Sequence, residues 1–369
     1  MRDTIFVPSF GNRPRNLVGR EEIISAFESA LRNPPGSRER AMLILGQRGS
    51  GKTVLLLEFA DVARKYGCVV ASPTVVSQEM PVRILEKLQS DGEPYLPGTR
   101  NRITGASVSA FGFGGGIDLK SEELDSKSFA GKLSGLCSEL NKRGKPVLLL
   151  VDEVQAEQKE LRQLIIAYQE MVGEGLDVFI VLAGLPTTVS AVLNDHVLTF
   201  LNRASKIDLP PLKIGDIEFY YKKVFSELNI RLRDEQISRA AEKTGGSPYL
   251  MQLIGHYIAL SAEAGDSVSD SQFSATIQRA REDFMNDICE TTLAPLSGKD
   301  IAFLAAMAVY GEAVEMADVI SKLHCTASLA QTYKRRLIQA GVIRQPRRGI
   351  VQFAVPYLRD YLYKNYKDT

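Results

Sequence analysis

The chain of 369 residues is long enough for two or three domains, each with a buried core of its own. Its 44% apolar and 24% charged residues are the composition of an ordinary soluble globular protein. The net charge of +1 excludes a molecule that attracts polyanions by its overall charge.

The four cysteines lie far apart and form no Cys-x-x-Cys pair, so the sequence indicates neither a disulfide framework nor a zinc site. The first eight residues carry no apolar signal-peptide core. No apolar stretch approaches the roughly 20 residues that cross a bilayer. We therefore expect a cytoplasmic protein with reduced thiols and no membrane contact.

Residues 1–211 predict an α/β domain with a five-stranded, mainly parallel sheet. Short apolar runs alternate here with helical stretches. The runs are continuously apolar, which is typical of strands covered by helices on both faces. The five predicted strands are Ala41–Leu45, Cys68–Val76, Val147–Val151, Val178–Ala183 and Lys206–Leu209.

A segment rich in Gly, Ser and Asn, residues 91–120, interrupts this alternation. We interpret it as an insertion between the second and third strands. Ile103–Ala110 and Ile117–Lys120 form a hairpin in one interpretation, and a flexible surface segment is the favoured alternative. The sequence assigns no chemistry to this segment.

Residues 212–292 are predicted to form a helical lid, because apolar residues recur at three- and four-residue spacing. Asp234 is the predicted N-cap of the second lid helix, and Gly245-Gly246 the predicted end of it. The expected helices are Ile214–Leu228, Asp234–Thr244, Tyr249–Ala264 and Ser269–Ile288.

Residues 293–369 predict a winged helix-turn-helix domain. Three helices come first, at Ser297–Val309, Ala317–Leu323 and Ser328–Ala340. A turn at Gln345–Gly349 and a strand at Ile350–Val355 then form a hairpin, and a terminal helix follows. Residues 296–369 carry 11 Lys and Arg against 6 Asp and Glu, so this unit is basic although the whole chain is not.

A phosphate-binding Walker A loop is predicted at Gly46-Gln47-Arg48-Gly49-Ser50-Gly51-Lys52-Thr53, between a strand and a helix. Glycines let successive backbone N–H groups point at the β- and γ-phosphates, and the following helix presents the positive end of its dipole. Lys52 supplies a positive charge to the phosphate oxygens, and the Thr53 hydroxyl is a ligand for Mg²⁺.

The apolar run Val147–Val151 ends in Asp152-Glu153, which is the pattern of a Walker B motif. At this strand end, the Asp152 carboxylate is expected to hold Mg²⁺ through water. Glu153 is expected to orient or deprotonate the attacking water. The second acidic residue favours hydrolysis over binding alone.

These motifs resemble the AAA+ ATPases of the group that contains archaeal origin-recognition initiators, helicase loaders, transposition-helper ATPases and the related STAND signalling NTPases. Asn16–Glu22 is similar to the "VGRE" box of that group, and Thr244–Leu250 is similar to its "tGG-x-P" lid helix. The resemblance spans roughly residues 14–260. It implies ATP as the nucleotide, with Val18 and Gly19 against the adenine and Pro248 at the lid side of the site.

Two positions depart from the AAA+ pattern. Gly184 ends the fourth strand, where many AAA+ ATPases have a polar sensor-1 residue, so Thr187 or Thr188 would have to reach the γ-phosphate. Pro248 and Tyr249 stand where an initiator-type ATPase has its sensor-2 arginine. Both losses predict slow turnover and a switch-like cycle.

Arg203 precedes the fifth strand, in a place that resembles the arginine finger of related ATPases. Such an arginine acts on the nucleotide of a neighbouring subunit and neutralises charge on the γ-phosphoryl oxygens. A solvated surface arginine is the equally weighted alternative.

The third C-terminal helix is the predicted recognition helix, with Leu329, Leu337 and Ile338 in the core. Duplex DNA is the favoured partner of its outward face and of the wing, while docking of a protein stays open. The predicted DNA-binding residues are Ser328, Gln331, Lys334, Arg335, Arg347 and Arg348.

The leading hypothesis is an ATP-dependent switch associated with duplex DNA. In this hypothesis, ATP and Mg²⁺ promote closure of the lid, and closure promotes self-association or the loading of a partner protein. The alternative is a STAND-type signalling or defence ATPase whose winged helix contacts protein.

Overall fold

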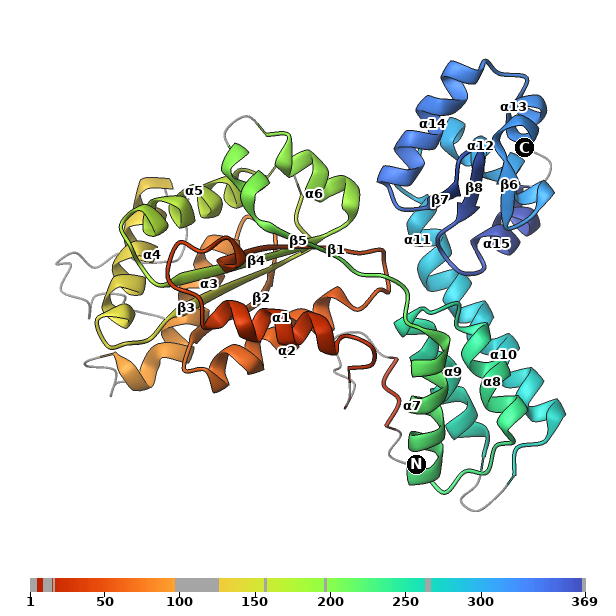
Figure 1. The fold of residues 1–369 in the computed structure, drawn as a ribbon, viewed down its shortest axis with the longest axis horizontal. Coiled ribbons are helices and arrows are strands. Elements are labelled where there is room, and N and C mark those ends of the chain that lie inside the picture. Colours follow the sequence, from red (N-terminus) through yellow and green to blue (C-terminus); the bar gives the residue numbers. More distant parts are fainter. Residues whose placement is uncertain are drawn as a thin grey trace.

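The computed structural model describes residues 5–8, 15, 17–96, 126–155, 158–195, 198–262 and 267–366. They form three parts: an α/β domain, a helical lid and a C-terminal domain with its own small sheet (Figure 1). The predicted α/β class with a five-stranded sheet is confirmed. No helix in these ranges is both long and apolar enough to span a membrane.

The central sheet has the strand order β2-β3-β4-β1-β5, and all its pairings are parallel. Each strand lies within two residues of the bounds expected from the sequence, because continuous apolar runs identify strands buried on both faces. All six residues of β3 are buried, for example. The strands are β1 (Ala41–Leu45), β2 (Val69–Val75), β3 (Val147–Asp152), β4 (Val178–Gly184) and β5 (Ser205–Asp208).

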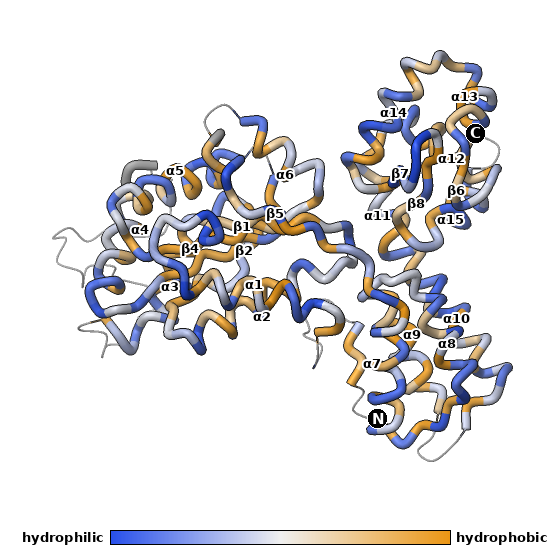
Figure 2. The backbone as a smooth tube through the Cα atoms, viewed as in Figure 1, coloured by the Kyte–Doolittle hydropathy of each residue, from blue (hydrophilic) through white to orange (hydrophobic). Residues whose placement is uncertain are grey.

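Helices cover both faces of this sheet and form a separate hydrophobic core with each face. On one face, the Phe27 and Phe59 rings stack with centroids 4.0 Å apart. This face is covered by α1 (Glu21–Leu31) and α2 (Lys52–Lys65). The other face is covered by α3 (Met80–Gly92), α4 (Ser126–Asn141), α5 (Lys159–Gly173) and α6 (Pro186–Leu193). Figure 2 shows the hydrophobic residues concentrated along the strands between these layers.

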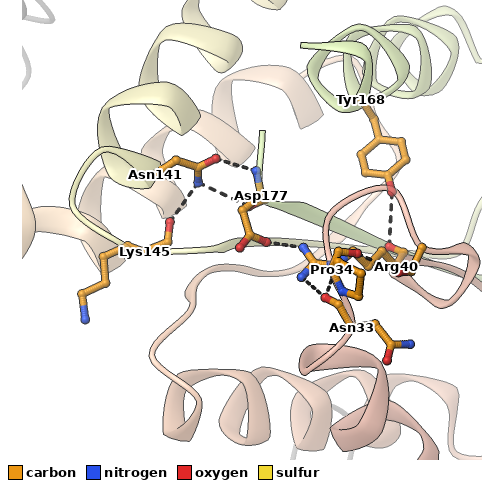
Figure 3. A network of polar contacts seen from close by, with 8 residues as sticks. Asn33, Pro34, Arg40, Asn141, Lys145, Tyr168 and Asp177 are labelled. Carbon is orange, nitrogen blue, oxygen red and sulfur yellow. Dashed lines mark hydrogen bonds and ion pairs between the residues drawn. The ribbon is translucent and has the colours of Figure 1, made fainter. Parts of the chain in front are cut away.

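A polar network holds the amino-terminal ends of the strands β1 and β4 together (Figure 3). Arg40 precedes β1, is 4% exposed, and pairs with Asp177, which precedes β4. The Arg40 guanidinium also lies over the Phe179 ring, 4.0 Å from its centroid, and Nε donates to Asn33 O at 2.9 Å. Asn141 Oδ1 accepts from the Asp177 N–H at 2.6 Å. A buried charge is tolerated only when it is paired in this way, so the network aligns β1 and β4 at the edge opposite to their carboxyl ends.

The lid consists of α7 (Ile214–Glu227), α8 (Asp234–Lys243), α9 (Pro248–Ser261) and α10 (Asp270–Phe284). Asp234 is the first residue of α8 rather than its N-cap, since Arg233 caps the helix and its N–H donates to Gln236 Oε1. Gly245 and Gly246 have positive φ angles and end α8 as expected. The fourth predicted helix ends at Phe284 and continues as a π-helical turn, η5 (Met285–Cys289).

The N-terminal segment packs into the lid and not against the sheet, which corrects the assignment of all residues 1–211 to the α/β domain. Phe6 is 1% exposed among Tyr220, Tyr221 and Phe225. The Val7 N–H donates to Gln252 Oε1 at 2.9 Å. Only the tertiary structure reveals this position, because the three apolar residues directly before Pro8 carry no periodic pattern.

The C-terminal domain contains a three-stranded antiparallel sheet in the order β6-β8-β7. The hairpin turn is tighter than expected, because residues 343–347 form a strand up to Arg348-Gly349. Leu329 is 43% exposed, so its prediction as a core residue was wrong; Ala330 and Tyr333 are buried instead. The elements are α11 (Glu290–Leu293), α12 (Gly298–Tyr310), β6 (Ala313–Glu315), α13 (Met316–Leu323), α14 (Ala327–Gln339), β7 (Ile343–Arg347), β8 (Ile350–Phe353) and α15 (Leu358–Tyr366).

Part of the predicted insertion at residues 91–120 is ordinary structure. Asp91 and Gly92 complete α3, and Asp91 Oδ1 accepts from Arg64 Nε at 2.8 Å. A short 3₁₀ turn, η2 (Glu93–Tyr95), follows. The predicted hairpin at Ile103–Ala110 and Ile117–Lys120 lies outside the described residues.

Candidate nucleotide-binding site

The loop at residues 46–53 leaves the carboxyl end of β1 and leads into α2, as the sequence predicts. Its Gly46 N–H donates to Gly184 O at 3.2 Å, which ties the loop to the end of β4. Gly49 and Gly51 have φ angles of 73° and 88°, in the left-handed region that favours glycine. The loop therefore turns sharply at two glycines and leads into the amino end of α2, as phosphate-binding loops do.

The Lys52 side chain folds back and hydrogen-bonds to the start of the loop. Its Nζ donates to Gly46 O at 2.9 Å and to Gln47 O at 2.8 Å. Burial lowers the pKa of Lys52 to about 8, although the Asp152 and Glu153 carboxylates act in the opposite direction. The structure therefore holds a partly desolvated ammonium group in the loop, where an anion gains most from it.

Asp152 and Thr53 meet at the carboxyl end of β3. Thr53 Oγ1 donates to the buried Asp152 Oδ2 at 2.5 Å. A hydroxyl and a carboxylate at this separation are oxygen ligands of the kind that Mg²⁺ prefers, so these two residues fit a magnesium site.

Glu153 has a backbone conformation that non-glycine residues rarely adopt, with φ at 52°. Its N–H donates to Asp152 Oδ1 at 2.9 Å, and its side chain is exposed beside the loop. Left-handed residues of this kind cost about 1–3 kcal/mol and gather at functional sites. The sharp turn directs the Glu153 carboxylate away from the strand and toward solvent.

The end of β4 has no room for a polar side chain. A β-carbon on Gly184 would lie 2.5 Å from Val154 Cγ2, a distance that such atoms do not reach. Thr188, one of the two threonines considered for this role, donates its hydroxyl to Leu185 O at 3.0 Å. Gly184 is thus fixed by packing against the residue after the Walker B pair.

The lid packs directly on the loop. A β-carbon on Gly49 would lie 3.3 Å from Tyr249 Cβ and 3.6 Å from Ile288 Cδ1. Pro248 Cγ lies 3.9 Å from the corresponding position on Gly51. Pro248 and Tyr249 therefore contact the loop by apolar surface, and Ile288 brings the π-helical turn η5 to the same place.

The C-terminal domain also touches the loop, which the sequence does not predict. A β-carbon on Gly341, between α14 and β7, would lie 1.5 Å from Gln47 Nε2. Gly341 has φ at 68°, so both its conformation and the close approach require glycine. Helices α14 and α6 lie next to each other at this junction (Figure 1).

Val18 and Gly19 line a pocket of about 370 Å³ together with residues of α7. The next residue, Arg20, is 5% exposed and bridges two parts of the site. Its Nη2 donates to Pro210 O at 2.8 Å and to Ser50 O of the loop at 3.5 Å. The VGRE-like stretch thus lies beside the phosphate loop, and Arg20 is a site residue that sequence reasoning did not single out.

Two groups of predicted residues lie apart from this cluster. Arg203 is exposed at the end of a 3₁₀ turn, η4 (Thr199–Arg203), before β5. In the C-terminal domain, Lys334 Nζ donates to Gln345 Oε1 at 3.3 Å and is half-buried. The other predicted DNA contacts have exposed side chains, namely Ser328, Gln331, Arg335, Arg347 and Arg348. Apart from the half-buried Lys334, these predicted contacts are open to solvent on the surface of the C-terminal domain.

The chain matches two protein families over separate parts of its length. Residues 16–181 match the family described as AAA ATPase domain. Residues 286–362 match the family described as Domain of unknown function (DUF8462). A search of curated proteins gives no match.

Several solved structures are similar along almost the whole chain. The Walker-type ATPase PABY2304 of Pyrococcus abyssi has a TM-score of 0.70 at 17% identity, covering 97% of this chain and 99% of that one. The ORC2 protein of Aeropyrum pernix, in ADPNP-ADP complexes, has a TM-score of 0.62 at 13% identity, covering 98% and 97%. Cdc6p from Pyrobaculum aerophilum has a TM-score of 0.50 at 14% identity, covering 99% and 97%. At these identities the likeness shows the fold alone: an α/β domain followed by a helical part and a C-terminal domain.

Proposed function

We propose that the protein binds Mg-ATP, hydrolyses it slowly as a conformational and assembly switch, and is held at duplex DNA through a C-terminal winged helix. One observation carries the switch: the phosphate loop contacts both the lid, at Tyr249 and Ile288, and the C-terminal domain, at Gly341. A change in the loop on nucleotide binding must therefore be accommodated by both neighbours, because packed contacts do not deform continuously.

The hydrolytic step is assigned to the residues at the ends of β1 and β3. Backbone N–H groups at the amino end of α2 and the Lys52 ammonium bind the β- and γ-phosphates. Thr53, and Asp152 through water, would hold Mg²⁺, which would neutralise charge at the phosphates. Glu153 accepts a proton from the attacking water or orients it by hydrogen bonding.

Slow turnover follows from what surrounds this centre. Gly184 offers no sensor-1 side chain, and Pro248 and Tyr249 contact the loop where a charged lid residue would stabilise the transition state. We assign the missing positive charge to Arg203 of a neighbouring subunit, since this exposed residue is free to enter another nucleotide site. Hydrolysis would then depend on self-association in the ATP state.

DNA binding is supported by the charge and exposure of the C-terminal domain. The order of three helices and a hairpin is the order of a winged helix, with α14 as the recognition helix and β7–β8 as the wing. Arg335 on α14 and Arg347 and Arg348 at the wing are exposed. The β7 segment is strongly hydrophilic in Figure 2, as expected of a surface that contacts phosphates.

The test compares the ATPase activity of the natural protein and of Glu153→Gln, with and without duplex DNA, and measures size in ATP and in ADP. We expect Glu153→Gln to bind ATP normally and to hydrolyse it at least about a hundredfold more slowly. DNA should stimulate the natural protein, and its affinity for DNA should fall steeply with salt. ATPase activity without any salt-dependent DNA binding would favour a signalling ATPase whose winged helix docks a protein.

A further inference from the structure

The pocket of about 370 Å³ lies between the segment before α1 and the first turns of α7. Arg20 connects it to the phosphate loop through the Ser50 carbonyl. Its position beside the loop and its size suit the base of a nucleotide whose phosphates are held by residues 46–53. Its lining residues are Leu17, Val18, Gly19, Glu21, Asp216, Phe219, Tyr220 and Lys223.

Gly19 and Asp216 form a donor and an acceptor on one side of this pocket. Asp216 Oδ2 lies 3.3 Å from the position of a β-carbon on Gly19. The Gly19 N–H donates to Glu21 Oε1 in an exposed contact of 3.3 Å, which a ligand can replace. Within the described residues, no hydrogen bond or ion pair engages the Asp216 carboxylate.

The Asp216 carboxylate and the Gly19 N–H complement the hydrogen-bonding groups of adenine and not those of guanine. An ionised carboxylate only accepts hydrogen bonds, and a backbone N–H only donates them. Adenine presents an amino donor at C6 beside the N1 acceptor. Guanine presents the O6 acceptor beside an N1–H donor, so both of its groups would face a group of the same kind. Leaving such groups unpaired is costly, and a site built on hydrogen bonds therefore discriminates strongly.

We propose that Asp216 selects adenine over guanine, by accepting a hydrogen bond from the 6-amino group while the Gly19 N–H donates to N1. This inference rests on the proposed function as an ATP-binding protein. Phe219 lines the same pocket and is 74% exposed, which is unusual for such a large apolar side chain. A stacked base would cover its ring, and base stacking on an aromatic ring contributes to binding without distinguishing the purines.

Asp216 also lies in the first turn of α7, where a negative charge stabilises a helix through its dipole. A test has to separate that role from base selection. The variants Asp216→Asn and Asp216→Ala remove the charge, while Glu21→Gln removes the other carboxylate of the pocket. Melting temperature measures the helix role, and the ratio of affinities for two nucleotides does not depend on it.

The experiment measures the affinities of ATP, GTP and purine riboside triphosphate, which is ATP without the 6-amino group, in the Glu153→Gln background. We expect Asp216→Ala to weaken ATP about tenfold and to leave purine riboside triphosphate unchanged. Removing the amino group from the ligand should therefore cost about tenfold in the parent and nothing in Asp216→Ala. Asp216→Asn should narrow the preference for ATP over GTP, because its amide also donates to O6, and Glu21→Gln should keep that preference.

Two results overturn these statements in different ways. If the parent binds ATP but Asp216→Ala keeps the same ratio between ATP and purine riboside triphosphate, Asp216 does not read the base. If the parent binds none of the three nucleotides, the proposed function itself fails.

Discussion

The α/β domain and the C-terminal domain use charge in opposite ways. At the nucleotide site, Lys52, Thr53 and Asp152 are bonded to backbone or to one another, and Asp152 is buried. In the C-terminal domain, Arg335 and Arg347 are exposed to solvent. The first site is pre-organised, so its chemistry can be read from internal geometry. In the proposed function the second surface is completed by duplex DNA, so only its charge and shape are defined in the protein alone.

The largest effect is expected from removing the positive charge of Lys52 in the loop at residues 46–53. Lys52→Ala should weaken ATP binding by about a hundredfold or more, because charge-assisted hydrogen bonds to phosphate disappear from a poorly solvated loop. Isothermal titration with ATP measures this effect. Lys65→Ala, at the other end of α2, is the matched control and should bind like the natural protein. Equal affinity in the two variants would remove Lys52 from the site.

The contact between the two regions can be broken at Gly341. Its replacement by alanine forces Gln47 away and should destabilise the docked arrangement by about 1–3 kcal/mol. Faster hydrogen exchange around residues 338–345 and at the phosphate loop would report the change. Gly349→Ala is the control, since Gly349 has φ at 83° but nothing within 4 Å of its β-carbon position. The same exchange rates in both variants would mean that the Gly341 contact does not couple the C-terminal domain to the phosphate loop.

The pH dependence of nucleotide affinity should distinguish the half-buried Lys52 from exposed arginines. The pKa of Lys52 is lowered to about 8, and the ammonium form binds phosphate, so ATP affinity should fall by up to about tenfold per pH unit above 8. For Lys52→Arg the affinity should not change over this range. Without nucleotide, the effect of pH on stability has the opposite sign to its effect on ATP affinity. The unfolded chain binds more protons between pH 8 and 10.5, so the Lys52 contribution to the free energy of unfolding rises with pH there.

The smallest effects are expected at the exposed basic surface. Arg347→Ala should weaken duplex DNA binding a few-fold and reduce the slope of log affinity against log salt by about 1. Arg336→Ala is the informative comparison, because Arg336 pairs with Asp300, whose side chain is 7% exposed. It should lower the melting temperature and leave the salt slope unchanged. A reduced slope for Arg336→Ala would place that residue on the DNA surface instead.

Local patterns predicted the sheet and the loop between β1 and α2 well, and the binding roles of the loop residues stay predictions. The β1 and β3 strands are continuous apolar runs, and Gly46–Thr53 follows a spacing that the phosphate loop requires. Contacts between distant segments left no such pattern. Gln47 and Gly341 are almost 300 positions apart in the sequence. They come together because Gly341 has no side chain to fill the space that Gln47 occupies. Leu329 was misassigned because a short amphipathic helix fits two rotations about its axis, and only packing against α12 selects one.

The insertion of Phe6 into the lid has a mechanical consequence. The chain crosses between the lid and the α/β domain twice, once between Pro8 and Leu17 and once between Leu209 and α7. Two connections restrict the rotation of the lid to the axis that passes through both of them. A single connection would also allow the lid to twist. The lid shares its hydrophobic core with the C-terminal domain, so we expect the two to rotate together about the line through both connections. Tyr249 and Ile288 lie on this body, so any rotation of it changes their contacts with Gly49 of the phosphate loop.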